Sequence, residues 1–176
     1  RHIGPIALAD LREVDTQKAR FARNVAQFVA GRPANNVLLS GARGTGKSSL
    51  VRAALNEHAA HGLRLIEVDK TDLIDLPDLI ELMHARPERF MVFCDDLSFD
   101  DGEPGYKALK SVLDGTVSAS SDNVMIVATS NRRHLLPEYH ADNQTYHRDA
   151  DGELHPGEAV EEKISLSERF GLWISF

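Results

Sequence analysis

The chain has 176 residues, 42% of them hydrophobic, and its 27 acidic and 20 basic side chains give a formal net charge of −7. This length and composition fit one compact domain with a real core. The negative charge repels a phosphate backbone, and the basic residues are scattered, so nucleic-acid binding by this segment is not expected.

The chain carries no pattern that predicts export or membrane insertion. It has no apolar run of about twenty residues and no signal-peptide pattern. Cys94 is the single cysteine, so no internal disulfide forms, and it lies in an apolar run where it packs like a small aliphatic group. We therefore expect a cytoplasmic protein. Because the chain begins at Arg1 and ends at Phe176 directly after an apolar run, we expect a fragment of a longer protein.

Strand-like and helical segments alternate along the chain. The first predicted helix spans residues 16–30, with Phe21, Val25 and Phe28 on one face and Gly31 at its end. Apolar runs bounded by turn residues predict five strands, at residues 37–39, 63–68, 90–94, 124–129 and 172–176. Helical spacing predicts helices at residues 48–61, 77–85, 105–113 and 159–167. The alternation predicts a three-layer α/β fold with parallel strands and ligands at their carboxyl ends.

Residues 41–48, with the sequence Gly-Ala-Arg-Gly-Thr-Gly-Lys-Ser, match the phosphate-binding pattern G-x-x-x-x-G-K-[ST] between a predicted strand and a predicted helix. The glycines let successive backbone N–H groups point at phosphate oxygens. Lys47 is expected to reach the β and γ phosphates, Ser48 to ligate Mg²⁺, and Ser49 to contact the α phosphate. The predicted nucleotide-binding residues of this P-loop are Gly41, Ala42, Arg43, Gly44, Thr45, Gly46, Lys47, Ser48 and Ser49.

The P-loop match leaves two alternatives open. One is a Gly-rich turn that fits the pattern by chance. The other is a P-loop that binds nucleotide without hydrolysing it.

Residues 90–96 form an apolar strand run that ends in two acids, as in a Walker B segment. Such a strand delivers its acids to the carboxyl edge of the sheet. Asp95 is expected to hold Mg²⁺, usually through water, and Asp96 to polarise the attacking water. The alternative is that Asp96 only caps the following turn.

A second apolar strand run, residues 124–129, leads to Asn131. The amide of Asn131 can orient water or contact the γ phosphate. The alternative is an ordinary turn residue.

Residues 137–162 break the alternation, because they are rich in Asp, Glu, His, Gly and Asn. They predict a long exposed loop, and a loop of this length is a candidate partner-binding arm. Four histidines in or near it suggest a metal site, but their spacing matches no zinc pattern, which favours a solvated loop. These histidines are His134, His140, His147 and His155.

Together, in this order and at this spacing, these motifs resemble the AAA+ superfamily over nearly the whole chain. Residues 10–18 are similar to the region that packs against adenine, which implies nucleotide contacts for Leu11 and Arg12. Asn131 falls at the position of sensor 1, and Arg169 falls at that of the arginine finger.

The resemblance also implies the fold: the AAA+ large subdomain, a three-layer α/β/α P-loop NTPase with a five-stranded parallel sheet in the order 5-1-4-3-2. Residues 1–36 would form an N-terminal segment and helix, and residues 137–162 an insertion. The helical lid and its sensor 2 arginine would follow Phe176, outside this chain.

In that family the arginine finger acts in trans, so Arg169 would reach the γ phosphate held by a neighbouring subunit, and activity would need a homo-oligomer. The alternative is a surface arginine paired with Glu168 or Glu162. Most AAA+ proteins carry Glu where this chain has Asp96, which is one methylene shorter. Hydrolysis is therefore expected to be slow, or to use a neighbour such as Asp100 or Glu103.

Residues 94–99, 153–158 and 167–172 resemble an uncharacterised bacterial family of stand-alone AAA+ ATP-binding proteins. Residues 69–75 lack the aromatic residue with which threading unfoldases grip a polypeptide, which argues against protein pulling. The sequence thus predicts an ATPase that uses ATP and Mg²⁺ and acts as an oligomer on a macromolecular partner. The alternatives are an ATP-binding switch or scaffold with little hydrolysis and, with less support, a P-loop small-molecule kinase.

Overall fold

The structure is a computed structural model that describes residues 6–12, 14–99, 103–115, 123–131, 147–148, 154–155 and 166–176. At its centre lies a five-stranded parallel sheet in the order β2-β3-β4-β1-β7. The strands are β1 (Val37–Ser40), β2 (Leu63–Glu67), β3 (Arg89–Cys94), β4 (Val124–Ser130) and β7 (Leu172–Ser175). With β7 as the fifth predicted strand, both the α/β fold and the strand order 5-1-4-3-2 are confirmed.

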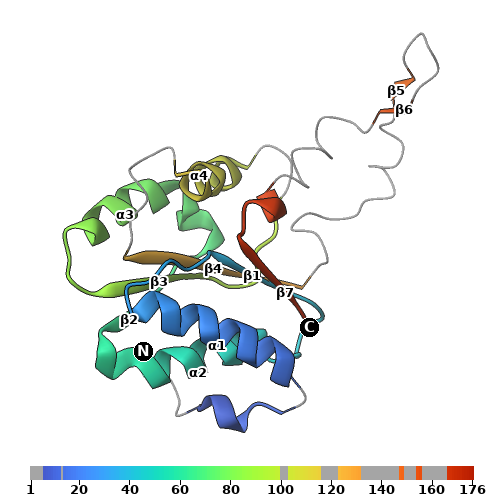
Figure 1. The fold of residues 1–176 in the computed structure, drawn as a ribbon. Coiled ribbons are helices and arrows are strands. Elements are labelled where there is room, and N and C mark those ends of the chain that lie inside the picture. The colour runs from blue at the N-terminus through green and yellow to red at the C-terminus, as the bar shows by residue number, and fades with distance from the viewer. Residues whose placement is uncertain are drawn as a thin grey trace.

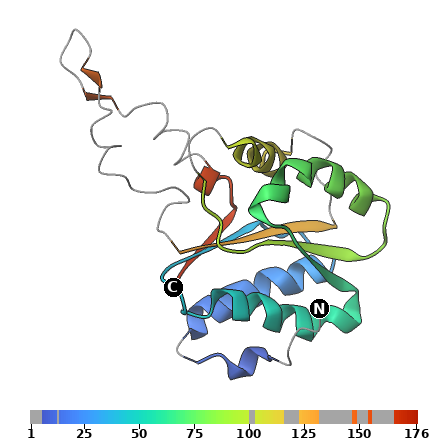
Figure 2. The ribbon, with the colours of Figure 1, turned by 180° about the vertical axis from the view of Figure 1, so that it is seen from behind.

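Helices cover both faces of this sheet, so the molecule has three layers (Figures 1 and 2). One face carries α1 (Asp15–Val29) and α2 (Lys47–His58), with the short helices η1 (Leu8–Asp10) and η2 (Ala59–His61) beside α2. The other face carries η3 (Lys70–Asp75), α3 (Leu76–His84) and α4 (Pro104–Leu113). The four α-helices match predicted ones to within a few residues, except that residues 59–61 are 3-10 rather than α, and the short helices η1 and η3 were not predicted. Of the predicted helix at 159–167, residues 159–165 lie outside the described residues, and residues 166–168 are helical.

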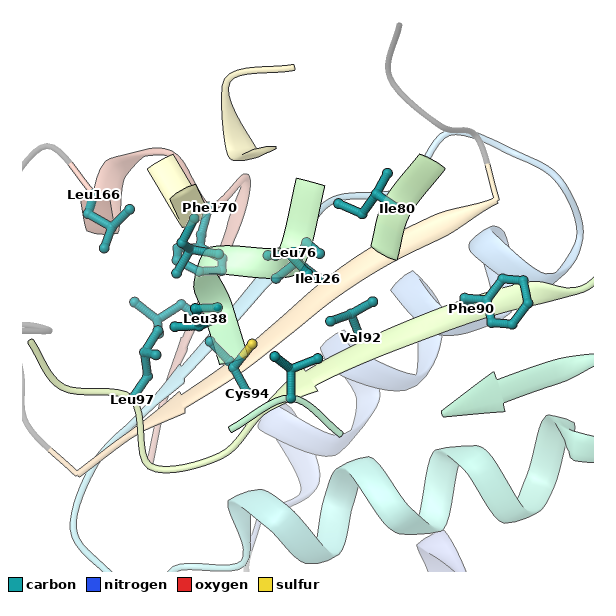
Figure 3. Close-up of a cluster of buried hydrophobic side chains, with 14 of the residues drawn as sticks. Leu38, Leu76, Ile80, Phe90, Val92, Cys94, Leu97, Ile126, Leu166 and Phe170 are labelled. Atoms are coloured by element: carbon teal, nitrogen blue, oxygen red, sulfur yellow. The ribbon is translucent and has the colours of Figure 1, made fainter. Parts of the chain in front are cut away.

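The apolar strand runs fill two cores, because successive side chains of a strand point to opposite faces of the sheet. From β3, Phe90, Val92 and Cys94 face the layer of α3 and α4, where Figure 3 draws them. Met91 and Phe93 of the same strand face α1 and α2. Burial on both sides explains why the strands read as continuous apolar runs rather than alternating ones.

Cys94 packs as the sequence predicts. It is 1% exposed, and burial raises the pKa of its thiol to about 12. The thiol therefore stays protonated at neutral pH and serves as an apolar core side chain.

The parallel arrangement gathers the polar strand ends at one edge of the sheet. β4 lies between β1 and β3, with Ser40 in register with Ser130 and Cys94 in register with Ala128. The loop that follows β1, the acids that follow β3 and the polar end of β4 are therefore neighbours. Hydrogen bonds from Gly41 N to Ser130 O (3.1 Å) and from Leu97 N to Thr129 O (2.7 Å) tie these three connections together.

Within residues 137–162, the structure describes only β5 (His147–Arg148) and β6 (Leu154–His155), which pair antiparallel. The remainder of this segment, together with His134 and the side chains of His147 and His155, lies outside the described residues. The predictions of an exposed loop and of a histidine metal site therefore stay predictions. Among the residues that are described, no helix combines the length and apolar character that a membrane crossing requires.

Candidate nucleotide-binding site

The P-loop curls between β1 and α2 as a turn that only glycine accommodates at its two ends. Gly46 precedes α2 with φ +95°, and Gly41 has φ +141°. A side chain at Gly41 would also place its Cβ 2.8 Å from the carbonyl oxygen of Phe176, the residue that follows β7. The predicted need for glycine in this loop thus has both a conformational and a steric cause.

Lys47 opens α2 and is almost buried, at 5% exposure. Its ammonium donates hydrogen bonds to the carbonyl oxygens of Gly41 (2.7 Å) and Ala42 (2.6 Å) and to Thr45 Oγ1 (3.3 Å). Burial lowers the pKa of Lys47 below its ordinary value of 10.5, while the charges of Asp95 and Asp96 raise it by less. The loop therefore holds a partly desolvated cation close to two carboxylates.

The side chains of Ser48 and Thr129 both contact the carboxylate of Asp95. We call these three residues the Asp95 group. The carboxylate oxygen Oδ1 of Asp95 accepts hydrogen bonds from Ser48 Oγ (2.8 Å) and Thr129 Oγ1 (2.6 Å). Thr129 Oγ1 in turn accepts a hydrogen bond from the backbone N–H of Asp96 (2.8 Å). The P-loop helix, the end of β3 and the end of β4 are thereby joined through one carboxylate oxygen.

Magnesium fits the Asp95 group by its donor chemistry. Mg²⁺ prefers hard oxygen ligands and is often bound through one or two side chains together with phosphates and water. Ser48 Oγ and Asp95 Oδ1 are such ligands and lie 2.8 Å apart, as the sequence motifs predict. Elsewhere in the described part of the chain, no group of three or more His, Cys, Asp or Glu side chains is placed to hold a metal ion.

The second strand-end acid has different partners, and we call Arg43, Asp96 and Asn131 the Asp96 group. Asp96 Oδ1 accepts a hydrogen bond from Asn131 Nδ2 (2.6 Å), and Asp96 Oδ2 lies 3.4 Å from a guanidinium nitrogen of Arg43. Asp96 has φ +53°, a left-handed conformation that Asp tolerates better than most residues. Its carboxylate therefore faces two side-chain donors, one of which is the amide of Asn131.

A single hollow of about 320 Å³ unites most of the predicted site. Its lining consists of P-loop residues on one side and the strand ends on the other: Arg43, Gly44, Gly46, Lys47, Ser48, Ser49, Asp95, Asp96, Thr129 and Asn131. Thr129 is the lining residue to which sequence reasoning gave no role. Its signal is a hydroxyl near the buried end of a strand whose preceding residues are all apolar.

Six predicted site residues do not line this hollow: Gly41, Ala42 and Thr45 of the P-loop, and Leu11, Arg12 and Arg169. Leu11 is half-buried against the core under α1 and α2, and its carbonyl oxygen accepts a hydrogen bond from Lys18 (3.1 Å), while Arg12 is exposed. Arg169 forms a close ion pair with Asp114, the residue that follows α4. The described partner of Arg169 is thus Asp114 rather than the sequence neighbour Glu168.

Of the two acids considered as helpers of Asp96, only Glu103 lies among the described residues. Glu103 lies 2.8 Å from the ammonium of Lys70 and does not line the hollow. Asp100 and Glu162, the other suggested partner of Arg169, lie outside the described residues.

Comparison with known proteins places this site in a family. A family profile matches the whole chain, residues 1–176, and carries the description "Protein of unknown function (DUF815)". The chain belongs to the DUF815 family. The predicted resemblance to an uncharacterised family of AAA+ proteins is thereby confirmed.

Other known proteins share sequence or fold with this DUF815 chain. It is 36% identical over 88 residues to the replication factor C large subunit of Staphylothermus marinus, a match that covers 49% of the chain and 20% of that protein. It superposes on the RuvB Holliday junction branch migration motor of Thermotoga maritima with a TM-score of 0.58 at 16% identity, over 99% of the chain and 48% of RuvB. It also superposes on AMPPCP-bound DnaA from Aquifex aeolicus, with a TM-score of 0.59 at 17% identity, over 100% of the chain and 51% of DnaA.

These likenesses show the fold of the AAA+ large subdomain. The DUF815 chain spans about half the length of the RuvB and DnaA structures and a fifth of the replication factor C subunit.

Proposed function

We propose that this DUF815 chain is the nucleotide-binding core of an ATPase that uses ATP and Mg²⁺ and acts, as an oligomer, on a macromolecular partner. The observation that carries the proposal is the meeting of Lys47, the Ser48–Asp95 pair and the Asp96–Asn131 pair around one hollow beside the P-loop. The same fold in AMPPCP-bound DnaA supports a nucleotide as the occupant of that hollow.

Each polar group has a role in this proposal. The P-loop amides and Lys47 bind the phosphates, and Ser48 and Asp95 hold the Mg²⁺, which neutralises charge on the phosphate oxygens. A water oxygen forms a bond to the γ phosphorus while the bond from that phosphorus to the β–γ bridging oxygen breaks, so that ADP and phosphate leave. Asp96 accepts the proton of this water, and the Asn131 amide orients the carboxylate through their 2.6 Å hydrogen bond.

Arg169 is the residue for which the proposed function requires an oligomer. This side chain pairs with Asp114 and does not line the hollow of its own chain. In an oligomer it would offset the charge that develops on the γ phosphate of that neighbour.

For the partner of this segment, the net charge of −7 argues against nucleic acid. One protein of similar fold is known with DNA bound. ORC1 of Aeropyrum pernix, which superposes with a TM-score of 0.53 at 17% identity over 69% of this chain and 39% of ORC1, is solved in complex with DNA.

The activity is tested on the full-length protein by following phosphate release and molecular size, with and without a non-hydrolysable ATP analogue. We expect turnover, and we expect Lys47→Ala to abolish both nucleotide binding and turnover. Arg86→Ala breaks the exposed Arg86–Glu88 ion pair away from the site and serves as the matched control, with unchanged turnover. If Lys47→Ala turns over ATP at the rate of the wild type, this site is not the one that hydrolyses ATP.

The role of Arg169 in trans is tested by mixing two inactive variants. Lys47→Ala lacks a functional P-loop, and Arg169→Ala lacks the finger, but a mixed oligomer contains interfaces at which an intact P-loop meets an intact Arg169. We expect the mixture to recover part of the turnover. A mixture that assembles and stays inactive would contradict an action in trans.

A second candidate function is an ATP-dependent switch with negligible hydrolysis. It is favoured by Asp96, whose short side chain is already engaged by Arg43 and Asn131. Measuring the nucleotide that remains bound after purification, alongside steady-state turnover, separates the two functions. Retained ATP without phosphate release favours the switch.

A further inference from the structure

The Asp96 group separates two hollows at the carboxyl edge of the sheet. The first is the hollow between the P-loop and the strand ends. The second, of about 350 Å³, is walled by Leu97, Ser98 and Ser130. Arg43, Asp96 and Asn131 line both hollows and therefore form the boundary between them.

The ion pair in this boundary is weakly held. The charged groups of Arg43 and Asp96 are 3.4 Å apart, and their side chains are 84% and 56% exposed. Exposed pairs of this kind gain little in water, because solvent and salt screen the attraction. A stronger anion that reaches Arg43 will displace Asp96 at low cost.

A triphosphate bound in the P-loop supplies such an anion. Arg43 belongs to the P-loop itself and lines the hollow together with Lys47. A terminal phosphate carries more charge than a carboxylate, and it offers oxygens that match the planar fork of a guanidinium. ADP places one phosphate fewer in the loop and gives Arg43 no equivalent partner.

We propose that Arg43 is the residue through which this site distinguishes ATP from ADP. With ATP, Arg43 exchanges the carboxylate of Asp96 for the γ phosphate, and Asp96 keeps only its hydrogen bond from Asn131. With ADP, the Arg43–Asp96 pair persists and Asp96 stays engaged. Arg43 is thus a positioning residue that couples γ-phosphate binding to the release of Asp96, and this role rests on the proposed nucleotide-binding function.

The test compares the affinities of full-length protein for AMPPCP and for ADP, both with Mg²⁺, by calorimetry. We expect Arg43→Gln to weaken AMPPCP binding by about tenfold or more, the usual effect of losing a hydrogen bond to a charged group, and to leave ADP binding nearly unchanged. Arg52→Gln removes one exposed arginine from α2 and is the matched control, with both affinities unchanged. An equal loss for both nucleotides, or no loss for either, would overturn the inference.

A double-mutant cycle tests the exchange itself. Asp96→Asn removes the competing carboxylate, so it should tighten AMPPCP binding more in the presence of Arg43 than in the Arg43→Gln background. Additive effects of the two substitutions would show that Arg43 and the carboxylate do not compete.

Failure of this inference is distinguishable from failure of the proposed function. If the wild type binds both nucleotides and Lys47→Ala binds neither, the proposed site stands, and an unchanged AMPPCP-to-ADP ratio in Arg43→Gln overturns only the role of Arg43. If the wild type binds neither nucleotide, both proposals fall.

Discussion

Asp95 and Asp96 follow one another after β3 and are both exposed, yet their carboxylates have different partners. Asp95 accepts two short hydrogen bonds from hydroxyl groups, one of which belongs to Thr129, a residue that is only 2% exposed. Asp96 is 56% exposed and faces a neutral amide and a longer, exposed ion pair. Two aspartates at the end of one strand thus differ in the kind and the strength of the contacts that hold their carboxylates.

This difference assigns different tasks to the Asp95 group and the Asp96 group. The Asp95 group joins α2, the end of β3 and the end of β4 through hydrogen bonds to one carboxylate oxygen, which suits a carboxylate that must hold a metal ion in one place. The Asp96 group contains the exposed Arg43–Asp96 ion pair, whose members can change partners at low cost. The site therefore combines a fixed half with an adjustable half.

The largest expected effect comes from neutralising each acid in turn. Asp95→Asn should abolish the Mg²⁺-dependent part of AMPPCP binding, because the amide replaces a metal ligand. Asp96→Asn should keep Mg²⁺-dependent binding while turnover falls by about 10²- to 10⁴-fold, the usual contribution of a general base. Calorimetry with and without Mg²⁺, together with phosphate release, measures both effects.

The assignment of different tasks to Asp95 and Asp96 would be wrong if Asp95→Asn and Asp96→Asn had the same effect on Mg²⁺-dependent binding and on turnover. Asp96→Asn with wild-type turnover would show that another group accepts the proton. Asp95→Asn with undiminished Mg²⁺-dependent binding would remove the metal-holding role from the Asp95 group.

A smaller effect is expected on the free energy of unfolding, where substitutions in the Asp95 group should cost more than those in the Asp96 group. Thr129→Val keeps the shape of the side chain but deprives the Asp96 N–H of its acceptor and the Asp95 carboxylate of a donor. It should lower the free energy of unfolding by about 1–3 kcal/mol, the cost of a buried polar group without a partner. Asn131→Ala, in the Asp96 group, should lower it by less than about 0.5 kcal/mol, as for an ordinary surface substitution. Urea denaturation measures both values.

Thr129→Ser is the control, because serine retains the hydroxyl and loses only a methyl group. Its stability should lie close to that of the wild type. If Thr129→Ser is as unstable as Thr129→Val, the methyl group rather than the hydroxyl carries the role of Thr129.

The fixed half of the site could be predicted from the sequence, because its cause is local. The P-loop pattern places Ser48 at the start of a helix, and the apolar run before Asp95 places that acid at the end of a buried strand. Parallel strands bring such ends together whatever the details of the loops. The pairing of Ser48 with Asp95 therefore follows from the fold alone.

The adjustable half could not be predicted, because its contacts depend on how side chains from distant segments are oriented. Arg43 and Asp96 are 53 positions apart, and Arg169 and Asp114 are 55 apart, so sequence proximity pointed to other partners for Arg169. Thr129 escaped notice for a different reason. Threonine is common in strands, and only the neighbouring Asp95 and Asp96 give its hydroxyl a task.

The smallest expected effect concerns Lys47, whose ammonium feels the charges of both Asp95 and Asp96. Burial lowers its pKa below 10.5, so the free protein begins to lose this charge at a lower pH than an ordinary lysine does. Bound phosphates favour the charged form, so binding takes up a proton once the free ammonium titrates. Affinity for ADP in EDTA should therefore be constant at lower pH and then fall, by at most about tenfold per pH unit, as pH rises through the lowered pKa.

The same titration compares the two acids. Asp95 and Asp96 both raise the pKa of Lys47, and Asp95 does so more strongly. The fall in affinity should accordingly begin at lower pH in both Asp→Asn variants, with the larger displacement for Asp95→Asn. Lys47→Arg keeps its charge throughout this range and should give a flat profile, whatever its absolute affinity. A fall that persists in Lys47→Arg would assign the titration to another group, and a larger displacement for Asp96→Asn would place the adjustable acid, rather than the fixed one, closer to the ammonium.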